Sequence, residues 1–256
     1  ENLNVPVEIS QFSEHILKGV SSNWTITNAS GKTIFSGSFG KRNIPEGNGI
    51  SLGVIKTSLK TITQPSELTL TVKVGNYINN WQFFVYPEQV KQADTQIIVT
   101  DKLTDNIIAS LNKGARVLLT IKKGSLKSEY GGDVAIGFSS IFWNTAWTHG
   151  QPPETLGILC DPHHPAFKYF PTRSYTDYQW WDAMTHSSPI MLDSVSKGLN
   201  PIVRVIDDWV KARPLSLLFE CKVGKGKLMV SGIDLLTDMA DRPEAKQLTY
   251  SIENYT

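Results

Sequence analysis

The chain has 256 residues and a formal net charge of +1, and 40% of its residues are hydrophobic while 19% are charged. These values are typical of a globular chain that buries a core as one large domain or two ordinary ones. Because lysines and arginines are scattered and the charges nearly balance, we expect no nucleic-acid partner and no recruitment to an anionic membrane. No apolar run reaches the roughly 18 residues that a membrane-spanning helix needs, so we expect no membrane span.

Residues 1–88 carry the pattern of a β-sandwich. Short runs alternate apolar and polar side chains, as in 68–74 (LTLTVKV), which is the two-residue period of a strand with one buried face. Turn sequences such as NASG at 28–31 separate these runs. Six or seven such strands predict an immunoglobulin-like domain, and we expect Trp24 and Trp81 to pair across its core.

The pattern changes between residues 86 and 94, and residues 89–256 are predicted to form a second domain. One βαβ unit, with its strand, helix and strand, is predicted at 95–101, 103–112 and 115–121. Further strands are expected within 201–210 and on both sides of the turn at Gly224, and a helix that Pro243 opens is expected over 242–255. This order indicates an open α/β sheet of the flavodoxin-like or class I amidotransferase-like kind.

A long insertion in this second domain is rich in aromatic side chains. Four of the seven tryptophans lie between Trp143 and Trp181. Aromatic rings with polar handles in a loop-rich region mark either a platform for a sugar or a packed interface. The residues that a carbohydrate-binding site would use are Trp143, Trp147, His149, Tyr178, Trp180 and Asp182.

The alternative is that the aromatic side chains lock this insertion onto the sheet. Successive residues of a helix point about 100° apart, so Trp180 and Trp181 cannot both face one groove. We expect one of the two rings to pack inward and at most one to be exposed.

The two cysteines, Cys160 and Cys221, each lie in an apolar, strand-like run. Unoxidised cysteine packs as a small hydrophobic side chain, so we expect two buried free thiols. A class I amidotransferase seats its nucleophilic cysteine in a tight elbow with glycine two residues before and two residues after. Around Cys160 those positions hold Ile158 and Pro162, and proline lacks the N–H that an oxyanion hole could use. We expect no thiol catalysis.

The sequence also lacks the spacing of a metal site and the paired carboxylates of a glycosidase. No His-x-x-x-His or Cys-x-x-Cys spacing fixes a metal site, so we expect no metal and no cofactor, although several ligand types lie close together along the chain: His149, Asp161, His163, His164 and Asp182. Glycosidase chemistry needs two carboxylates across the scissile bond, and no motif pairs two carboxylates here. The chain also has no room for the eight βα units of a barrel enzyme, so we expect no catalytic residue in it.

The stretch LGILCDPHHPAFKYFPTRSYTDYQWWDAM resembles a segment near the C-terminus of glycoside hydrolase family 2 proteins, β-galactosidase-like enzymes of gut Bacteroidetes. In that family G-x-L-x-D-P-x-H-P, then F-P-T and Q-W-W-D, recur after the catalytic barrel. The matching residues are Gly157, Leu159, Asp161, Pro162, His164, Pro165, Phe170, Pro171, Thr172, Gln179, Trp180, Trp181 and Asp182. GKGKLMVSGIDL and DRPEAKQLTYSI also resemble the closing segment of such proteins, and the resemblance covers residues 95–256.

The resemblance implies a non-catalytic C-terminal accessory region of a family 2 glycoside hydrolase, serving domain assembly or shaping the substrate side. The implied partners are the other domains of the parent glycosidase and an oligosaccharide, and the implied location is periplasmic or extracellular. The α/β domain is similar to the amidotransferase-like fold that some β-galactosidases use in assembly, with its nucleophile elbow lost. Two alternatives stay open: a carbohydrate-binding module that uses the Trp/Tyr cluster, and a diverged hydrolase.

Overall fold

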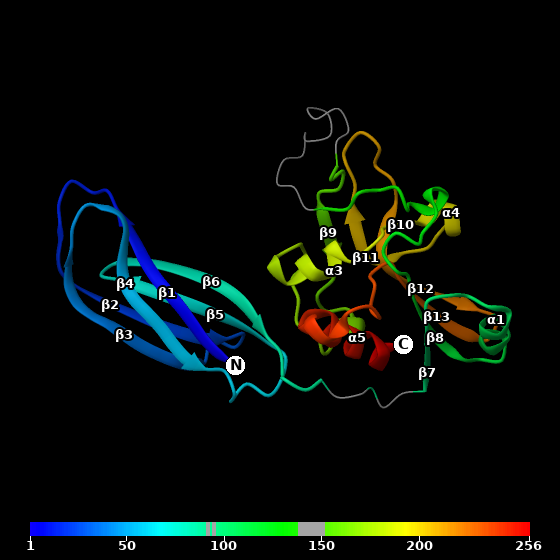
Figure 1. The fold of residues 1–256 in the computed structure, drawn as a ribbon, viewed down its shortest axis with the longest axis horizontal. Helices are drawn as coiled ribbons and strands as arrows, with labels where there is room; N and C mark the ends of the chain where they lie inside the picture. Colours follow the sequence, from blue (N-terminus) through cyan, green and yellow to red (C-terminus); the bar gives the residue numbers. More distant parts are fainter. Residues whose placement is uncertain (91–92, 94–95, 138–151) are drawn as a thin grey trace. The chain divides into compact units, whose positions relative to one another are not determined.

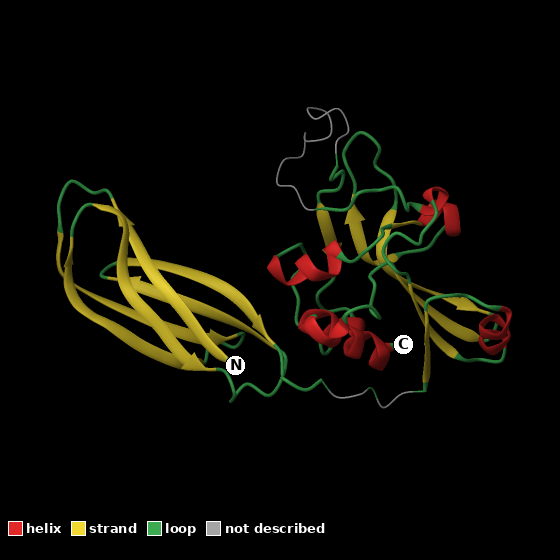
Figure 2. Cartoon of the chain, viewed as in Figure 1, coloured by secondary structure: helices red, strands yellow, loops and turns green. Residues whose placement is uncertain are grey.

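The computed structural model describes residues 1–90, 93, 96–137 and 152–256 (Figure 1). The chain divides into two compact units, Glu1–Glu88 and Gln89–Thr256. Strands dominate the structure, and the described helices all belong to the C-terminal unit (Figure 2). None of these described helices is long and apolar enough to cross a membrane.

The N-terminal unit is a β-sandwich, as the alternating runs predict. Its first sheet pairs β1 with β4, and its second sheet has the order β3-β2-β5-β6, with every pair antiparallel. The strands are β1 (Asn2–Gln11), β2 (Leu17–Asn28), β3 (Thr33–Ile44), β4 (Gly47–Ser58), β5 (Ser66–Val74) and β6 (Tyr77–Val85). β1 and β6 are each a terminal strand of their sheet, so each keeps one edge that pairs with no described strand.

The core of the sandwich follows from the two-residue period. In β5 the four apolar side chains at alternate positions from Leu68 to Val74 are buried, and the polar ones between them are not. Burying one large apolar side chain contributes about 1.5–3 kcal/mol, so this period decides which face of the sheet turns inward. Trp24 packs against this core. The expected pairing with Trp81 is wrong, because Trp81 lies on the edge strand β6 and is 47% exposed.

One mixed sheet forms the centre of the C-terminal unit. Its order is β7-β8-β13-β12-β11-β9, and β10 pairs with β12. The strands are β7 (Ile97–Thr100), β8 (Arg116–Thr120), β9 (Gly157–Cys160), β10 (Ile190–Met191), β11 (Pro201–Ile206), β12 (Leu215–Val223) and β13 (Gly226–Ser231). The α-helices are α1 (Asp105–Asn112), α3 (Trp181–Thr185), α4 (Leu192–Val195) and α5 (Pro243–Tyr255). The 3-10 helices are η1 (Ser128–Tyr130), η2 (Pro165–Phe167), η3 (Tyr178–Trp180) and η4 (Met239–Asp241).

The predicted βαβ unit is present as β7, α1 and β8. The hydroxyl of Thr104 accepts a hydrogen bond from Ile107 N–H at 3.4 Å and caps the start of α1. Gly114 has φ +107° just past the end of the helix, a conformation that an L side chain rarely adopts. β7 and β8 are therefore parallel neighbours, and β13 extends the parallel arrangement to a third strand.

The other half of the sheet departs from the flavodoxin-like expectation. A tight turn at Gly224 joins β12 to β13, so β12 must run antiparallel to it. β11 and β9 are antiparallel additions as well. The domain is thus an open sheet with helices, as expected, but its parallel part is limited to three strands.

Candidate functional site

The loop that follows β9 is organised by its own polar side chains. Asp161 Oδ1 accepts a hydrogen bond from His163 N–H at 2.9 Å, which closes a turn directly after the strand. His164 Nδ1 accepts from Ala166 N–H at 3.2 Å and caps η2, whose first position is Pro165. Since Nδ1 accepts, a neutral His164 ring carries its proton on Nε2. The DPHHP sequence is therefore a rigid connection between strand and helix.

Trp180 anchors the inside of the aromatic insertion. Its side chain is 0% exposed, and its ring meets Phe167 and Phe170 edge to face, with centroids 6.2 Å and 5.6 Å away. Its indole N–H donates to Thr172 Oγ1 at 2.8 Å, so the one polar atom of the ring is satisfied. Burial of this ring holds the segment 167–180 together.

Asp182 is engaged by a buried arginine. Arg242 Nε donates to both carboxylate oxygens of Asp182, at 2.9 Å and 3.0 Å, and the Arg242 side chain is 4% exposed. A second nitrogen of Arg242 donates to the carbonyl oxygens of Asp234 and Thr237. His186 Nδ1 lies 3.1 Å from Asp182 Oδ1. This cluster joins α3 to the segment that leads into α5.

The insertion is also fastened to α5 through its backbone. Ser251 Oγ donates to the carbonyl of Ala166 at 2.7 Å and accepts from Tyr169 N–H at 3.0 Å. Gln247 Nε2 donates to the carbonyl of Tyr169 at 2.6 Å. The polar side chains of α5 that face inward thus satisfy backbone groups of the insertion.

Tyr178 and Trp181 form the exposed part of the same segment. Tyr178 is 87% exposed and Trp181 is 50% exposed. Their rings are nearly parallel, at 11°, with centroids 6.3 Å apart. We call these two residues the exposed aromatic pair.

A hollow with polar side chains lies where β9 ends, β11 begins and β12 ends. Its volume is about 790 Å³, within the range of small-molecule sites in proteins. We call it the polar groove and define it by the polar side chains that line it, Asp161, His164, Asn200, Arg204 and Glu220. Leu159, Leu199 and Ile202 supply apolar surface beside them.

The carboxylate of Glu220 is held in position by Tyr255 and Lys227. Tyr255 OH donates to Glu220 Oε1 at 2.9 Å, and Lys227 Nζ lies 2.9 Å from Glu220 Oε2. The same ammonium lies 3.8 Å from the centroid of the Tyr255 ring, and the His164 ring meets that ring edge to face. Burial and then the bond to Glu220 raise the pKa of Tyr255 to about 12, so its hydroxyl stays a donor at neutral pH.

Both cysteines line the polar groove, and both are free thiols. Burial, and then the negative charges of Asp161 and Asp177, raise the pKa of Cys160 to about 12. Burial also raises the pKa of Cys221, which is half-buried rather than buried as expected. A thiol attacks as its thiolate, so neither side chain is activated as a nucleophile.

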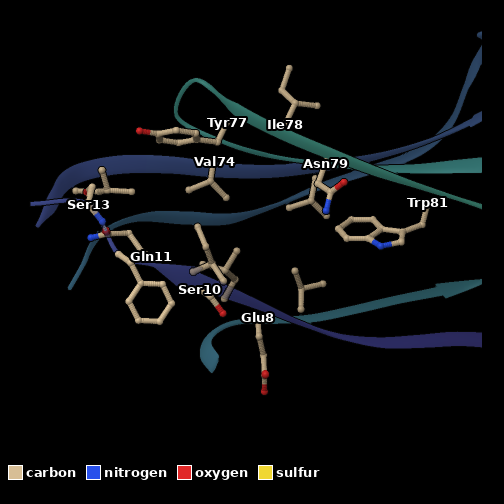
Figure 3. Close-up of a pocket in the computed structure, with 15 residues that line it drawn as sticks. Glu8, Ser10, Gln11, Ser13, Val74, Tyr77, Ile78, Asn79 and Trp81 are labelled. Atoms are coloured by element: carbon tan, nitrogen blue, oxygen red, sulfur yellow. Dashed lines mark hydrogen bonds between the residues drawn. The ribbon is translucent and has the colours of Figure 1, made fainter. Parts of the chain in front are cut away.

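The N-terminal unit has a hollow of the opposite character, which we call the apolar groove. Two adjoining cavities of about 410 and 440 Å³ follow the free edges of β1 and β6 and share Val7, Glu8 and Trp81. Figure 3 shows the Trp81 indole reaching into the space between the two strands, while the Glu8 carboxylate points away from it. Tyr77 and Ile78 on β6 are more than half exposed at 62% and 61%.

Residues 98–256 match the model of a protein family described as "Domain of unknown function (DUF8487)". The chain belongs to this family. Residues 1–87 match a second family model, described as "Domain of unknown function (DUF8488)". The two matches fall on the C-terminal and N-terminal units respectively.

Among solved structures, the chain is weakly similar to a glycoside hydrolase, the β-glucuronidase of Parabacteroides merdae with glycerol in its active site. The identity is 9% and the TM-score is 0.22, and the match covers 59% of this chain and 25% of that enzyme. The chain therefore spans about a quarter of that enzyme's length. No curated protein matches the chain.

Within the DUF8487 domain, the residues predicted to bind carbohydrate fall into three groups. Trp143, Trp147 and His149 lie outside the described residues. Trp180 cannot serve as a platform in this structure, because its ring is 0% exposed and its N–H is already bonded. Asp182 holds Arg242, and Tyr178 is open to solvent.

The structure brings together DUF8487 residues that sequence reasoning missed. Asn200 and Arg204 come from the start of β11 and Glu220 comes from β12, and they meet Asp161 and His164 only because β11 lies between β9 and β12. No spacing along the sequence connects these separate runs. The one available signal was Asp161 and His164, which the resemblance singled out and which line the same groove.

Proposed function

We propose that the chain is a non-catalytic accessory region of a glycoside hydrolase of the family 2 kind, acting in carbohydrate degradation by supporting domain assembly. One observation carries the proposal. The Q-W-W-D residues, which carry much of the resemblance, point their most recognisable side chains inward, with Trp180 in the core and Asp182 paired to Arg242. Side chains used in this way stabilise a module, and they do not act on a substrate.

The finer assignments belong to the same proposal. We assign the N-terminal unit to an immunoglobulin-like module, because β1-β4 opposite β3-β2-β5-β6 corresponds to strands B-E opposite C′-C-F-G. We assign the C-terminal unit to an amidotransferase-like module without its nucleophile elbow, supported by the raised pKa of Cys160. The other domains of the parent glycosidase are its proposed partners, and a periplasmic or extracellular location rests on the resemblance alone.

An assay of the purified chain tests the non-catalytic role. We expect no turnover of nitrophenyl β-galactoside or nitrophenyl β-glucuronide above the rate in buffer. Turnover that disappears when one Asp or Glu is replaced would instead establish the diverged hydrolase. Removing residues 89–256 from the parent protein should reduce its assembly or solubility, and an unaffected parent would contradict the accessory role.

A second candidate function is carbohydrate binding by the exposed aromatic pair. The observation in its favour is that two nearly parallel rings, Tyr178 and Trp181, stand open to solvent on one short helical segment. Aromatic faces of this kind pack against the C–H face of a sugar ring. Calorimetric titration with galactosides and plant oligosaccharides should show binding that Tyr178→Ala and Trp181→Ala both weaken. Trp209→Ala, which removes another exposed indole of the same unit, is the matched control.

A further inference from the structure

The polar groove offers hydrogen-bonding groups of both kinds on fixed elements. Asp161 and Glu220 present acceptors, Arg204 and His164 Nε2 present donors, and Asn200 presents both. Arg204 and Asn200 make no side-chain hydrogen bond or ion pair with any residue that the structure describes. Their side chains stand in a concave site with unused hydrogen-bonding capacity, while Glu220 is positioned by Tyr255 and Lys227.

The mixture of charges limits what such a groove can hold. An anionic ligand would meet the carboxylates of Asp161 and Glu220, and a cationic ligand would meet the guanidinium of Arg204. A neutral ligand with many hydroxyl groups avoids both penalties, because each hydroxyl can donate to a carboxylate and accept from a guanidinium or an amide. Leu159, Leu199 and Ile202 give the apolar surface on which the C–H face of a sugar ring packs.

We propose that the polar groove binds a neutral saccharide through Arg204, Asn200, Glu220 and Asp161. This goes beyond the proposed accessory function, since support of domain assembly needs no ligand. It also differs from binding at the exposed aromatic pair, because it uses strand ends and charged side chains instead of exposed rings.

The test is calorimetric or NMR titration of the whole chain with galactose, lactose and cellobiose, beside glucuronate and glucosamine as the anionic and cationic counterparts. We expect a neutral sugar to bind more tightly than either charged one. Arg204→Gln and Asn200→Ala should each weaken that binding by about tenfold, since each removes hydrogen bonds to the ligand. Both side chains lack structural partners among the described residues, so the variants should stay folded, as circular dichroism can check.

Lys222→Gln is the matched control, because it removes a positive charge from the same strand as Glu220 at a position that does not line the groove. It should leave affinity unchanged. Three results would overturn the inference: no binding of any neutral sugar, tighter binding of glucuronate, or binding that survives Arg204→Gln and Asn200→Ala. If binding survives those two and is lost in Tyr178→Ala, the saccharide site is the exposed aromatic pair. Hydrolysis of a glycoside would contradict the proposed function without affecting this site.

Discussion

Two tryptophan side chains, one in each unit, have opposite roles. In the C-terminal unit Trp180 is 0% exposed and closes the interior of the insertion. In the N-terminal unit Trp81 is 47% exposed and forms part of the wall of the apolar groove. The difference follows from the sheets. A two-stranded sheet leaves part of a four-stranded partner open, whereas the insertion and α5 together enclose their own rings. The hollow on the surface of the C-terminal unit, the polar groove, is therefore lined by polar side chains at the ends of strands.

The largest expected effect is that of Trp180→Ala. Truncating a fully buried aromatic side chain costs about 3–5 kcal/mol, and here the partner hydroxyl of Thr172 also loses its donor. We expect urea unfolding of the C-terminal unit to shift to much lower denaturant. Trp181→Ala, at a half-exposed neighbour, should cost about 1 kcal/mol or less. If the two variants lose the same free energy of unfolding, then Trp180 is not more important to the interior than its half-exposed neighbour Trp181.

The next effect is that of Asp182→Asn, which leaves Arg242 with a buried charge and no carboxylate. Breaking one side of a buried ion pair costs about 3–5 kcal/mol, and the partial exposure of Asp182 places this variant at about 3 kcal/mol. Chemical denaturation measures the loss. Asp101→Asn is the control, because its partner Lys122 is largely exposed and such a pair contributes less than about 1 kcal/mol. If both variants lose the same amount, the pair with Arg242 is not what joins α3 to the α5 segment.

The sequence pattern predicted those features of the fold that depend on residues close together in the chain. The period of β5, the βαβ unit and the inward turn of Trp180 beside an exposed Trp181 all follow from which face of one element is apolar. The position of Trp81 depends instead on strand order, since β6 is the last strand of its sheet and pairs only with β5 among the described strands.

The polar groove could not be predicted for the same reason. Arg204 and Glu220 are distant in sequence, and only the antiparallel addition of β11 and β9 beside β12 places them on one hollow. That addition depends on a hairpin at Gly224 that reverses the direction of half the sheet. The turn at Gly224 can be predicted from the sequence, but the order in which β11 and β9 join the sheet beside β12 cannot.

Low pH is expected to reduce the stability of the C-terminal unit by less than the two substitutions above. Burial raises the pKa of Asp207, but hydrogen bonds from Arg213 lower it by more, so the pKa lies below its ordinary value. A carboxylate of this kind contributes stability above its unfolded pKa, near 4, and that contribution is lost as the pH falls through the folded pKa. The free energy of unfolding of the C-terminal unit should therefore decline below about pH 4.

Asp207→Asn should flatten this acid decline and cost about 2 kcal/mol at neutral pH, where it removes hydrogen bonds to a charged group. Unfolding curves at several pH values give both quantities. An acid decline as steep in the variant as in the unaltered chain would mean that other carboxylates cause it.

The smallest effect on stability is expected at the apolar groove. Ile78→Lys replaces a side chain that is 61% exposed on the free strand β6, so the free energy of unfolding should change by no more than about 0.5 kcal/mol. A lysine on an unpaired edge opposes the addition of another strand, and it places a charge beside an apolar hollow. We therefore expect the variant to bind less of the dye anilinonaphthalene sulfonate and to associate less at high concentration. Sedimentation and dye titration measure the two changes.

Lys73→Gln, on the paired strand β5, is the control that alters charge without touching the groove. If Ile78→Lys destabilises the N-terminal unit as strongly as Trp180→Ala destabilises the C-terminal one, then β6 is part of a closed core and the two hollows differ less than their residues indicate.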